Sequence, residues 1–149
     1  MIAIAQLKEI RLRIDQLVGG LSPERLFRVP EGFANHIAWN AAHLAVTQQL
    51  LHYSLSGLQP HLPAEIIERY RKGTGANTAD EPSYRAAMEV FRRAPEQLGT
   101  DFSQGKFTSF QPYETSAGIR LGSIEDAIVF NNFHEGIHLG YILALRKLV

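Results

Sequence analysis

The chain has 149 residues, of which 45% are hydrophobic and 20% are charged, which is typical of one globular domain and argues against a disordered chain. Fifteen basic residues balance fifteen acidic ones, so the chain has no surplus of charge for binding nucleic acid or an anionic membrane surface. It has no cysteine, which excludes disulfides, thiolate metal ligands and a cysteine nucleophile.

Charged residues are spread through the N-terminal segment. Lys8, Glu9 and Arg11 interrupt its apolar residues, so it lacks the continuous hydrophobic region of a signal peptide. No other segment approaches the roughly 20 consecutive apolar residues that a membrane-spanning helix needs. These features predict a cytoplasmic protein that has neither nucleic acid nor a membrane as a partner.

The first segment is predicted to form a long amphipathic helix. Its apolar residues recur at spacings of three and four, at Leu7, Ile10, Ile14, Leu17 and Leu21. Arg11 and Asp15 lie between them, as on the polar side of such a helix. The helix is expected to end at Gly19-Gly20. A short helix over residues 23–28 is expected next, because Ser-Pro-Glu supplies an N-cap and a proline for the first turn.

A second long helix is predicted from Ala34 or Asn35 to about Leu55. Its apolar residues cover a wide arc, which indicates a central position in the fold. Residues 58–80 contain several prolines and glycines, which favour turns over long helices. This stretch is expected to be a connector within one domain, with a short helix at residues 64–70.

The third long helix is predicted to begin at the start signal Asp80-Glu81-Pro82. Pro95 lies inside its apolar pattern. Proline lacks the backbone N–H donor, and its ring clashes with the preceding turn of a helix. We therefore expect this helix to kink or to end near Ala94.

Residues 99–122 form a long irregular segment without helical periodicity. Two stretches within it, 107–113 and 119–121, can pair as a short β-hairpin. A sequence resembling a capping box then opens the last and most apolar helix, over residues 123–146. Four long helical segments joined by loops predict an all-α four-helix bundle that occupies residues 1–149 as a single domain.

The last helix carries the motif H-E-x-x-H, formed by His134, Glu135 and His138. Residues four apart lie on one face of a helix, so both imidazoles can reach the same metal ion. In zinc hydrolases the glutamate of this motif is the base that acts on metal-bound water. Because Glu135 leaves the helix about 100° from His134, it can instead pair with a surface or interface group. Both interpretations stay open.

A third protein ligand has to come from upstream of the motif, because the segment after His138 contains no His, Asp, Glu or Cys. His43 lies in an apolar stripe of the second long helix. Since bundles build metal sites from side chains on facing helices, His43, His134 and His138 predict a site for Zn²⁺, Ni²⁺ or a similar ion, with open positions for water or substrate. The alternative is three buried histidines that bind only backbone groups.

Three further polar residues are candidates for the surroundings of this site. Asn40 and Asn131 each precede a proposed ligand by three residues on the same helix face. They can orient an imidazole or a bound water molecule, or they can satisfy buried backbone groups. His36 precedes His43 by seven residues and can approach the site, but its place at the helix start also suits a capping or solvent-facing role.

Three stretches of the sequence resemble the DinB-like superfamily, and the similarity extends over nearly the whole chain. They begin at Ser22, Asn35 and Phe130 and include the motifs W-x-x-x-H-L and H-x-x-x-H. The resemblance implies a four-helix bundle of the up-down-down-up type, frequently dimeric, so a homodimer is expected. By motif, it also implies that the three histidines named above bind a divalent metal ion, most often zinc or nickel.

Characterised members of that superfamily include thiol-dependent transferases and isomerases that use low-molecular-weight thiols such as bacillithiol or mycothiol. The resemblance therefore implies a metal-dependent enzyme that activates a thiol or water for reaction with a small molecule. Transfer of a thiol to a small electrophile is the first expectation. Two alternatives stay open: a metal-dependent hydrolase with Glu135 as base, and a non-catalytic dimeric bundle that binds a metal or a small ligand.

Overall fold

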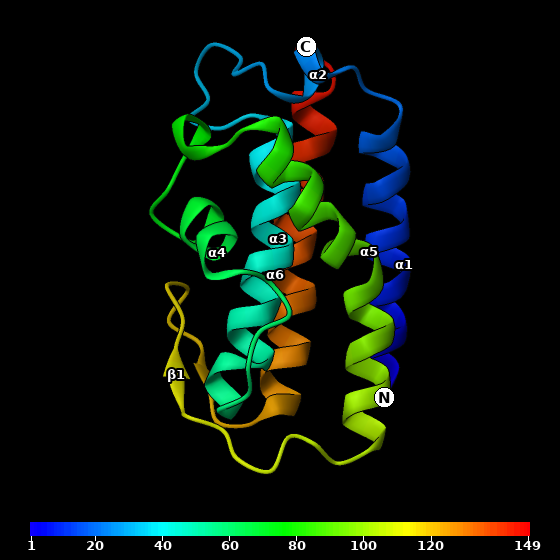
Figure 1. Cartoon of the computed structure of the whole chain (residues 1–149), viewed down its shortest axis with the longest axis vertical. Coiled ribbons are helices and arrows are strands. Elements are labelled where there is room, and N and C mark those ends of the chain that lie inside the picture. The colour runs from blue at the N-terminus through cyan, green and yellow to red at the C-terminus, as the bar shows by residue number, and fades with distance from the viewer.

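Four long helices form the bundle in the computed structural model, which describes residues 1–149. They are α1 (Ile2–Gly19), α3 (Ile37–His52), α5 (Glu81–Ser103) and α6 (Ile124–Leu145). In Figure 1, α1 and α6 run in one direction, and α3 and α5 run in the opposite direction. The expected all-α bundle with its up-down-down-up order is therefore confirmed.

Shorter elements connect the four long helices. They are α2 (Pro23–Leu26), η1 (Ser54–Ser56), α4 (Ala64–Tyr70), η2 (Ala76–Thr78), β1 (Tyr113–Glu114) and β2 (Arg120–Leu121). Because α3 and α5 run in the same direction, the chain has to return along the bundle between them, and α4 lies on this return path (Figure 1). The expected β-hairpin is present, with Tyr113 opposite Leu121 and Glu114 opposite Arg120 in an antiparallel pair.

Side chains cap the starts of three long helices. Asp80 caps α5 and Ser123 caps α6, as the sequence predicts. At α3 the cap is an imidazole: Nδ1 of His36 accepts a hydrogen bond from the Trp39 backbone N–H at 2.9 Å. Because this cap precedes it, α3 begins at Ile37, slightly later than the sequence suggests.

Pro95 does not end α5, which continues to Ser103. The axis of α5 changes direction about half-way along its length (Figure 1), as expected for a proline inside a helix. Proline leaves the carbonyl of Phe91, four residues earlier, without its usual donor. Arg11 Nη1 of α1 donates to this carbonyl at 3.2 Å. A side chain therefore replaces the missing bond, which explains why the helix bends but continues.

Helix α3 is the central helix of the bundle and is buried over most of its surface. Helix α6 packs against α3 and α1 but keeps one face exposed: Val129, Phe133 and Ile137 are 59%, 53% and 43% exposed. The central position predicted for α3 is thus confirmed. None of the helices combines the length and the apolar character that crossing a membrane requires.

Candidate metal centre

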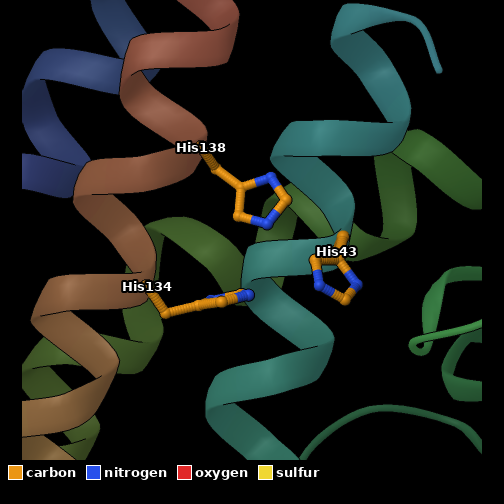
Figure 2. Close-up of side chains that lie close together, drawn as sticks. All are labelled: His43, His134 and His138. Carbon is orange, nitrogen blue, oxygen red and sulfur yellow. The ribbon is translucent and has the colours of Figure 1, made fainter. Parts of the chain in front are cut away.

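The three predicted ligands lie on two helices that pack side by side, α3 and α6. His43 is in the middle of α3, and His134 and His138 are about one turn apart on α6. Figure 2 shows the rings of His134 and His138 extending from α6 toward α3, which carries His43. Because residues four apart lie on one side of a helix, both rings of α6 enter the same space.

The three imidazole rings converge on one point. The ring centroids of His43 and His134 are 5.2 Å apart, those of His43 and His138 are 4.9 Å apart, and those of His134 and His138 are 4.6 Å apart. One nitrogen of each ring lies within 4.8 Å of a nitrogen of each other ring. The convergence predicted from the sequence is therefore confirmed.

A backbone carbonyl fixes the proton on the His43 ring. Nδ1 of His43 lies 2.6 Å from the carbonyl oxygen of Tyr70. A carbonyl can only accept, so Nδ1 carries the proton and Nε2 presents a lone pair. Nε2 also lies 3.2 Å from the Thr47 hydroxyl, which can donate to that lone pair. Tyr70 is the last residue of α4, where a helix has carbonyls without intrahelical partners, so α4 orients the ring.

An amide side chain fixes the proton on the His138 ring in the same way. Asn40 Nδ2 donates to the His36 carbonyl at 2.9 Å, which turns Asn40 Oδ1 toward His138. Nδ1 of His138 lies 2.8 Å from this Oδ1. Since the amide oxygen accepts, Nδ1 of His138 donates and Nε2 keeps its lone pair.

Burial favours the uncharged form of all three imidazole rings. Burial lowers the pKa of His134 to about 3, and the rings of His138 and His43 lower it further. Burial also lowers the pKa of His138 to about 3 and lowers the pKa of His43. No hydrogen-bond partner competes for Nδ1 of His134, although this atom is buried. Neutral imidazole is the form that binds metal ions, so the cluster needs little deprotonation before it can act as a ligand set.

The donor set fits a divalent metal ion that prefers nitrogen ligands. Three imidazoles are a frequent ligand set for zinc and suit nickel as well. Nitrogens that bind one zinc ion at about 2.0–2.1 Å in a tetrahedral site lie roughly 3.4 Å apart. The ring nitrogens of the cluster lie within 4.8 Å of one another, so the three rings are already close enough to share one ion. The cluster can hold a divalent ion and leave at least one coordination position for another molecule.

A family model of the DinB superfamily matches residues 6–142 of the chain. The chain belongs to the DinB superfamily. The matched span includes the three clustered histidines and most of every long helix, so the resemblance noted in the sequence is confirmed. No protein with a curated description matches the chain.

Glu135 lies on a different side of α6 in this DinB-superfamily bundle. Its carboxylate is fully buried and accepts hydrogen bonds from Arg11 Nε at 2.8 and 2.9 Å and from Asn131 Nδ2 at 3.2 Å. Burial raises the pKa of Glu135, and the positive charge of Arg11 opposes this rise. The carboxylate is not part of the histidine cluster. This geometry favours an ion pair over a base, but the partner is the buried Arg11 of α1 and not the surface or interface group that was expected.

The three other polar candidates, Asn40, Asn131 and His36, make different contacts. Asn40 contacts the ring of His138 directly, which is one of the two roles expected for it. Asn131 takes neither of its expected roles, because its amide donates to Glu135. His36 caps α3 with its ring, and that ring packs edge-to-face on Phe27 at 4.9 Å. Its contribution to the site is its backbone carbonyl, which orients Asn40.

The polar position expected for Arg11 is wrong, because the residue is only 2% exposed. A signal for its burial is present in the sequence. Arg11 follows Leu7 by four residues and precedes Ile14 by three, which places it on the buried side of α1. A single arginine on the apolar side of a helix indicates a buried acidic partner, because an unpaired buried charge is costly.

Two contacts of His43 had no clear sequence signal. The indole of Trp39 stacks on the His43 ring, with centroids 4.6 Å apart and an angle of 10° between the planes. The acceptor from Tyr70 is a backbone atom, which every residue type provides. A spacing of four residues suggests that Trp39 and His43 are neighbours on α3, but only the structure shows that their rings are parallel.

Proposed function

We propose that this chain is a divalent-metal-dependent enzyme of the DinB superfamily that transfers a thiol to a small electrophile. The observation that supports this function is the convergence of His43, His134 and His138 from two helices. Acceptors hold the Nδ1 protons of His43 and His138. Their Nε2 lone pairs can therefore face a cation once the Thr47 hydroxyl turns away from Nε2 of His43. Such oriented, neutral nitrogens are what a zinc or nickel site requires.

A divalent ion in the cluster supplies Lewis acidity, which lowers the pKa of a thiol or water molecule beside it. The residues of the chain provide the setting for this chemistry. The Tyr70 carbonyl and the Asn40 amide keep two rings in position, and Trp39 covers one face of His43. The indole of Trp39 limits the access of water to this side of the cluster, and electrostatic interactions are stronger where water is excluded.

We place thiol transfer ahead of hydrolysis because the cluster contains no carboxylate. A hydrolase of the H-E-x-x-H type needs its glutamate as a base next to the attacking water. The carboxylate of Glu135 is instead engaged by Arg11. A thiol whose pKa is lowered can lose its proton to solvent and then react as a thiolate, without a protein base.

Metal content per chain tests the site. The wild type and the variants His43→Ala and His138→Ala are stripped with a chelator, loaded with zinc or nickel, and analysed by elemental mass spectrometry. His61→Ala is the matched control, because the side chain of His61 is 41% exposed and outside the cluster. We expect one ion per chain in the wild type and in the control, and loss of the ion in the two cluster variants. Equal metal content in all four proteins would contradict the proposal.

A panel of thiols with a chromogenic electrophile tests the reaction, with ester and amide substrates measured in parallel. We expect metal-loaded wild type to consume the thiol and the electrophile together, and metal-free protein or His43→Ala to be inactive. Ester or amide cleavage that disappears in Glu135→Gln would favour the hydrolase instead. Metal binding without turnover of any substrate would favour a binding protein.

We also propose that the exposed face of α6 joins two copies of the chain. Val129 and Phe133 are apolar and more than half exposed on this face. Gly136 and Gly140 follow on the same side of the helix, and a Cβ added to either would meet nothing within 4 Å. A symmetric dimer would remove these apolar side chains from water, and the glycines would allow close approach of the two helices.

A further inference from the structure

A cleft of about 390 Å³ lies next to the histidine cluster, between α6 and the segment that leads into α3. Its nine lining residues are Gly32, Phe33, Ala34, Asn35, Trp39, Asn40, Ile137, His138 and Tyr141. Among them are one proposed metal ligand, the amide that orients it and the tryptophan that stacks on another ligand. A molecule in the cleft therefore lies beside the metal centre.

Aromatic rings form much of the wall of this cleft. The rings of Phe33 and Tyr141 meet edge-to-face with centroids 6.4 Å apart. The ring of His138 lies 6.4 Å from that of Tyr141 and 6.3 Å from that of Trp39. Flat apolar groups pack well in such surroundings, in offset-stacked or edge-to-face contact with the rings.

None of the nine lining residues is an Asp, Glu, Lys or Arg. Each of the two lining amides has at least one partner within the protein. Asn40 bonds both the His36 carbonyl and His138, and Asn35 Oδ1 accepts from the Ala76 N–H at 3.0 Å. A charged group that entered the cleft would lose water and gain no ionic partner from these side chains, which is unfavourable.

We propose that this cleft binds the electrophilic substrate and that this substrate is a small uncharged molecule with an aromatic or similarly flat apolar group. The proposal rests on the function proposed above, since it assigns the substrate class of the same centre. Thiols that carry carboxylates find no cationic side chain in this cleft, so carboxylates that do not reach the metal ion have to remain outside it. A larger groove of about 680 Å³ lies between α1 and α6 around Phe133, but it contains none of the three histidines.

Trp39 is the one tryptophan of the chain, so its fluorescence reports on the cleft directly. Benzyl alcohol, benzoate and benzylamine share one ring and differ in charge near neutral pH. Each is titrated into metal-free protein, because benzoate and benzylamine could otherwise bind to the ion itself. We expect benzyl alcohol to change the fluorescence and to bind at least tenfold more tightly than either charged analogue. Equal affinity for all three probes, or no binding of benzyl alcohol, would overturn the proposal.

Two tyrosines of similar exposure provide the variant and its control. Tyr141 lines the cleft and is 50% exposed, whereas Tyr113 lies on β1, is 40% exposed and does not line it. Tyr141→Ala should weaken the binding of benzyl alcohol at least fivefold, and Tyr113→Ala should leave it unchanged. Phe33→Ala is a second variant with the same expected loss, in case Tyr141→Ala alters the fold. Unchanged affinity in both cleft variants would also overturn the proposal.

The two proposals can fail separately. If the metal analysis finds no ion but benzyl alcohol still binds with the expected preference, the proposed enzyme function is wrong. The cleft is then still a binding site for small uncharged molecules with a flat apolar group. If an ion binds but the neutral probe does not, the metal centre stands and the substrate class assigned to the cleft is wrong.

Discussion

Arg11 and Glu135 form an ion pair at the centre of the bundle, where their side chains are 3% and 0% exposed. The guanidinium also donates to the carbonyls of Leu44 at 2.9 Å and Phe91 at 3.2 Å. One side chain of α1 therefore contacts α3, α5 and α6 together. Because the Phe91 carbonyl lacks its donor at Pro95, the same arginine also compensates for the proline in α5.

Replacing Glu135 with leucine should strongly destabilise the protein. The substitution leaves the Arg11 charge buried without its partner, which typically costs about 3–5 kcal/mol in the free energy of unfolding. The double variant Arg11→Met/Glu135→Leu should recover part of this loss, because two apolar side chains replace the ion pair. Recovery should be incomplete, since the Phe91 carbonyl then has no donor. Urea unfolding measures all three values, and a single variant as stable as the wild type would contradict the structural role of the pair.

The same position separates a structural Glu135 from a catalytic one. Glu135→Gln keeps the shape of the side chain and removes its charge. If the residue is structural, this variant should be less stable at neutral pH but should bind as much metal as the wild type. Its activity per folded molecule should then stay within a few-fold of the wild type. A loss of 100-fold or more in kcat at unchanged metal content would restore Glu135 as the base.

Asn40 should affect metal affinity without being a ligand. Its Oδ1 accepts the Nδ1 proton of His138, and removal of such a partner typically weakens metal binding 10- to 100-fold. We expect Asn40→Ala to show this loss in a competition titration with a zinc chelator. The matched control is Asn132→Ala, since Asn132 donates to the Ala3 carbonyl on the side of α6 that faces α1. Equal zinc affinity in both variants would contradict the role of Asn40.

The helices could be predicted well from the sequence because their signals are local. Each of these signals acts within a few residues. They are the spacing of apolar residues, the capping residues Asp80 and Ser123, and the glycines at the end of α1. The continuation of α5 past Pro95 could not be predicted in this way, because the compensating donor is Arg11, which lies 80 positions from Phe91 in the chain. A long-range contact of this kind has no local signature.

The ligand set could also be predicted, because four-residue spacing on a helix determines which side chains share a face. The groups that orient the rings were only partly predictable. Asn40 could be predicted because its amide side chain is polar and lies on the same helix face as His43. The acceptor for His43 could not be predicted, because it is the backbone carbonyl of Tyr70. The role of Glu135 depended on which neighbour its carboxylate meets, and only the packing of α1 against α6 determines that neighbour.

An acidic residue in the exposed face of α6 should prevent dimer formation. Phe133 is 53% exposed at the centre of this face, and Phe133→Asp would place a charge in the proposed contact at little cost to the single chain. Sedimentation velocity should give a dimer for the wild type and a monomer for the variant. Tyr113→Asp, on the hairpin, should remain dimeric. A monomeric wild type at concentrations of tens of micromolar would refute the proposed interface.

His52 should make the protein sensitive to mild acid. Its ring is fully buried and neither nitrogen makes a well-aligned hydrogen bond. Burial lowers its pKa to about 3, although the nearby backbone of Ala127 opposes this shift. The unfolded chain binds the proton near pH 6.5, so the unfolded state holds more protons between pH 6.5 and about 3, and stability falls as the pH falls through this window. At pH 5 the effect of this one ring amounts to about 2 kcal/mol relative to pH 8.

The variant His52→Leu isolates this contribution. It should be at least as stable as the wild type at pH 8, because it removes an imidazole that is buried without partners. Its stability should fall about 2 kcal/mol less than that of the wild type between pH 8 and pH 5, measured by urea unfolding of metal-free protein. The fall should not vanish, because burial also lowers the pKa of His36, His134 and His138. An unchanged pH dependence would contradict this prediction. It would mean that the buried ring of His52 takes up a proton in the folded protein as readily as in the unfolded chain.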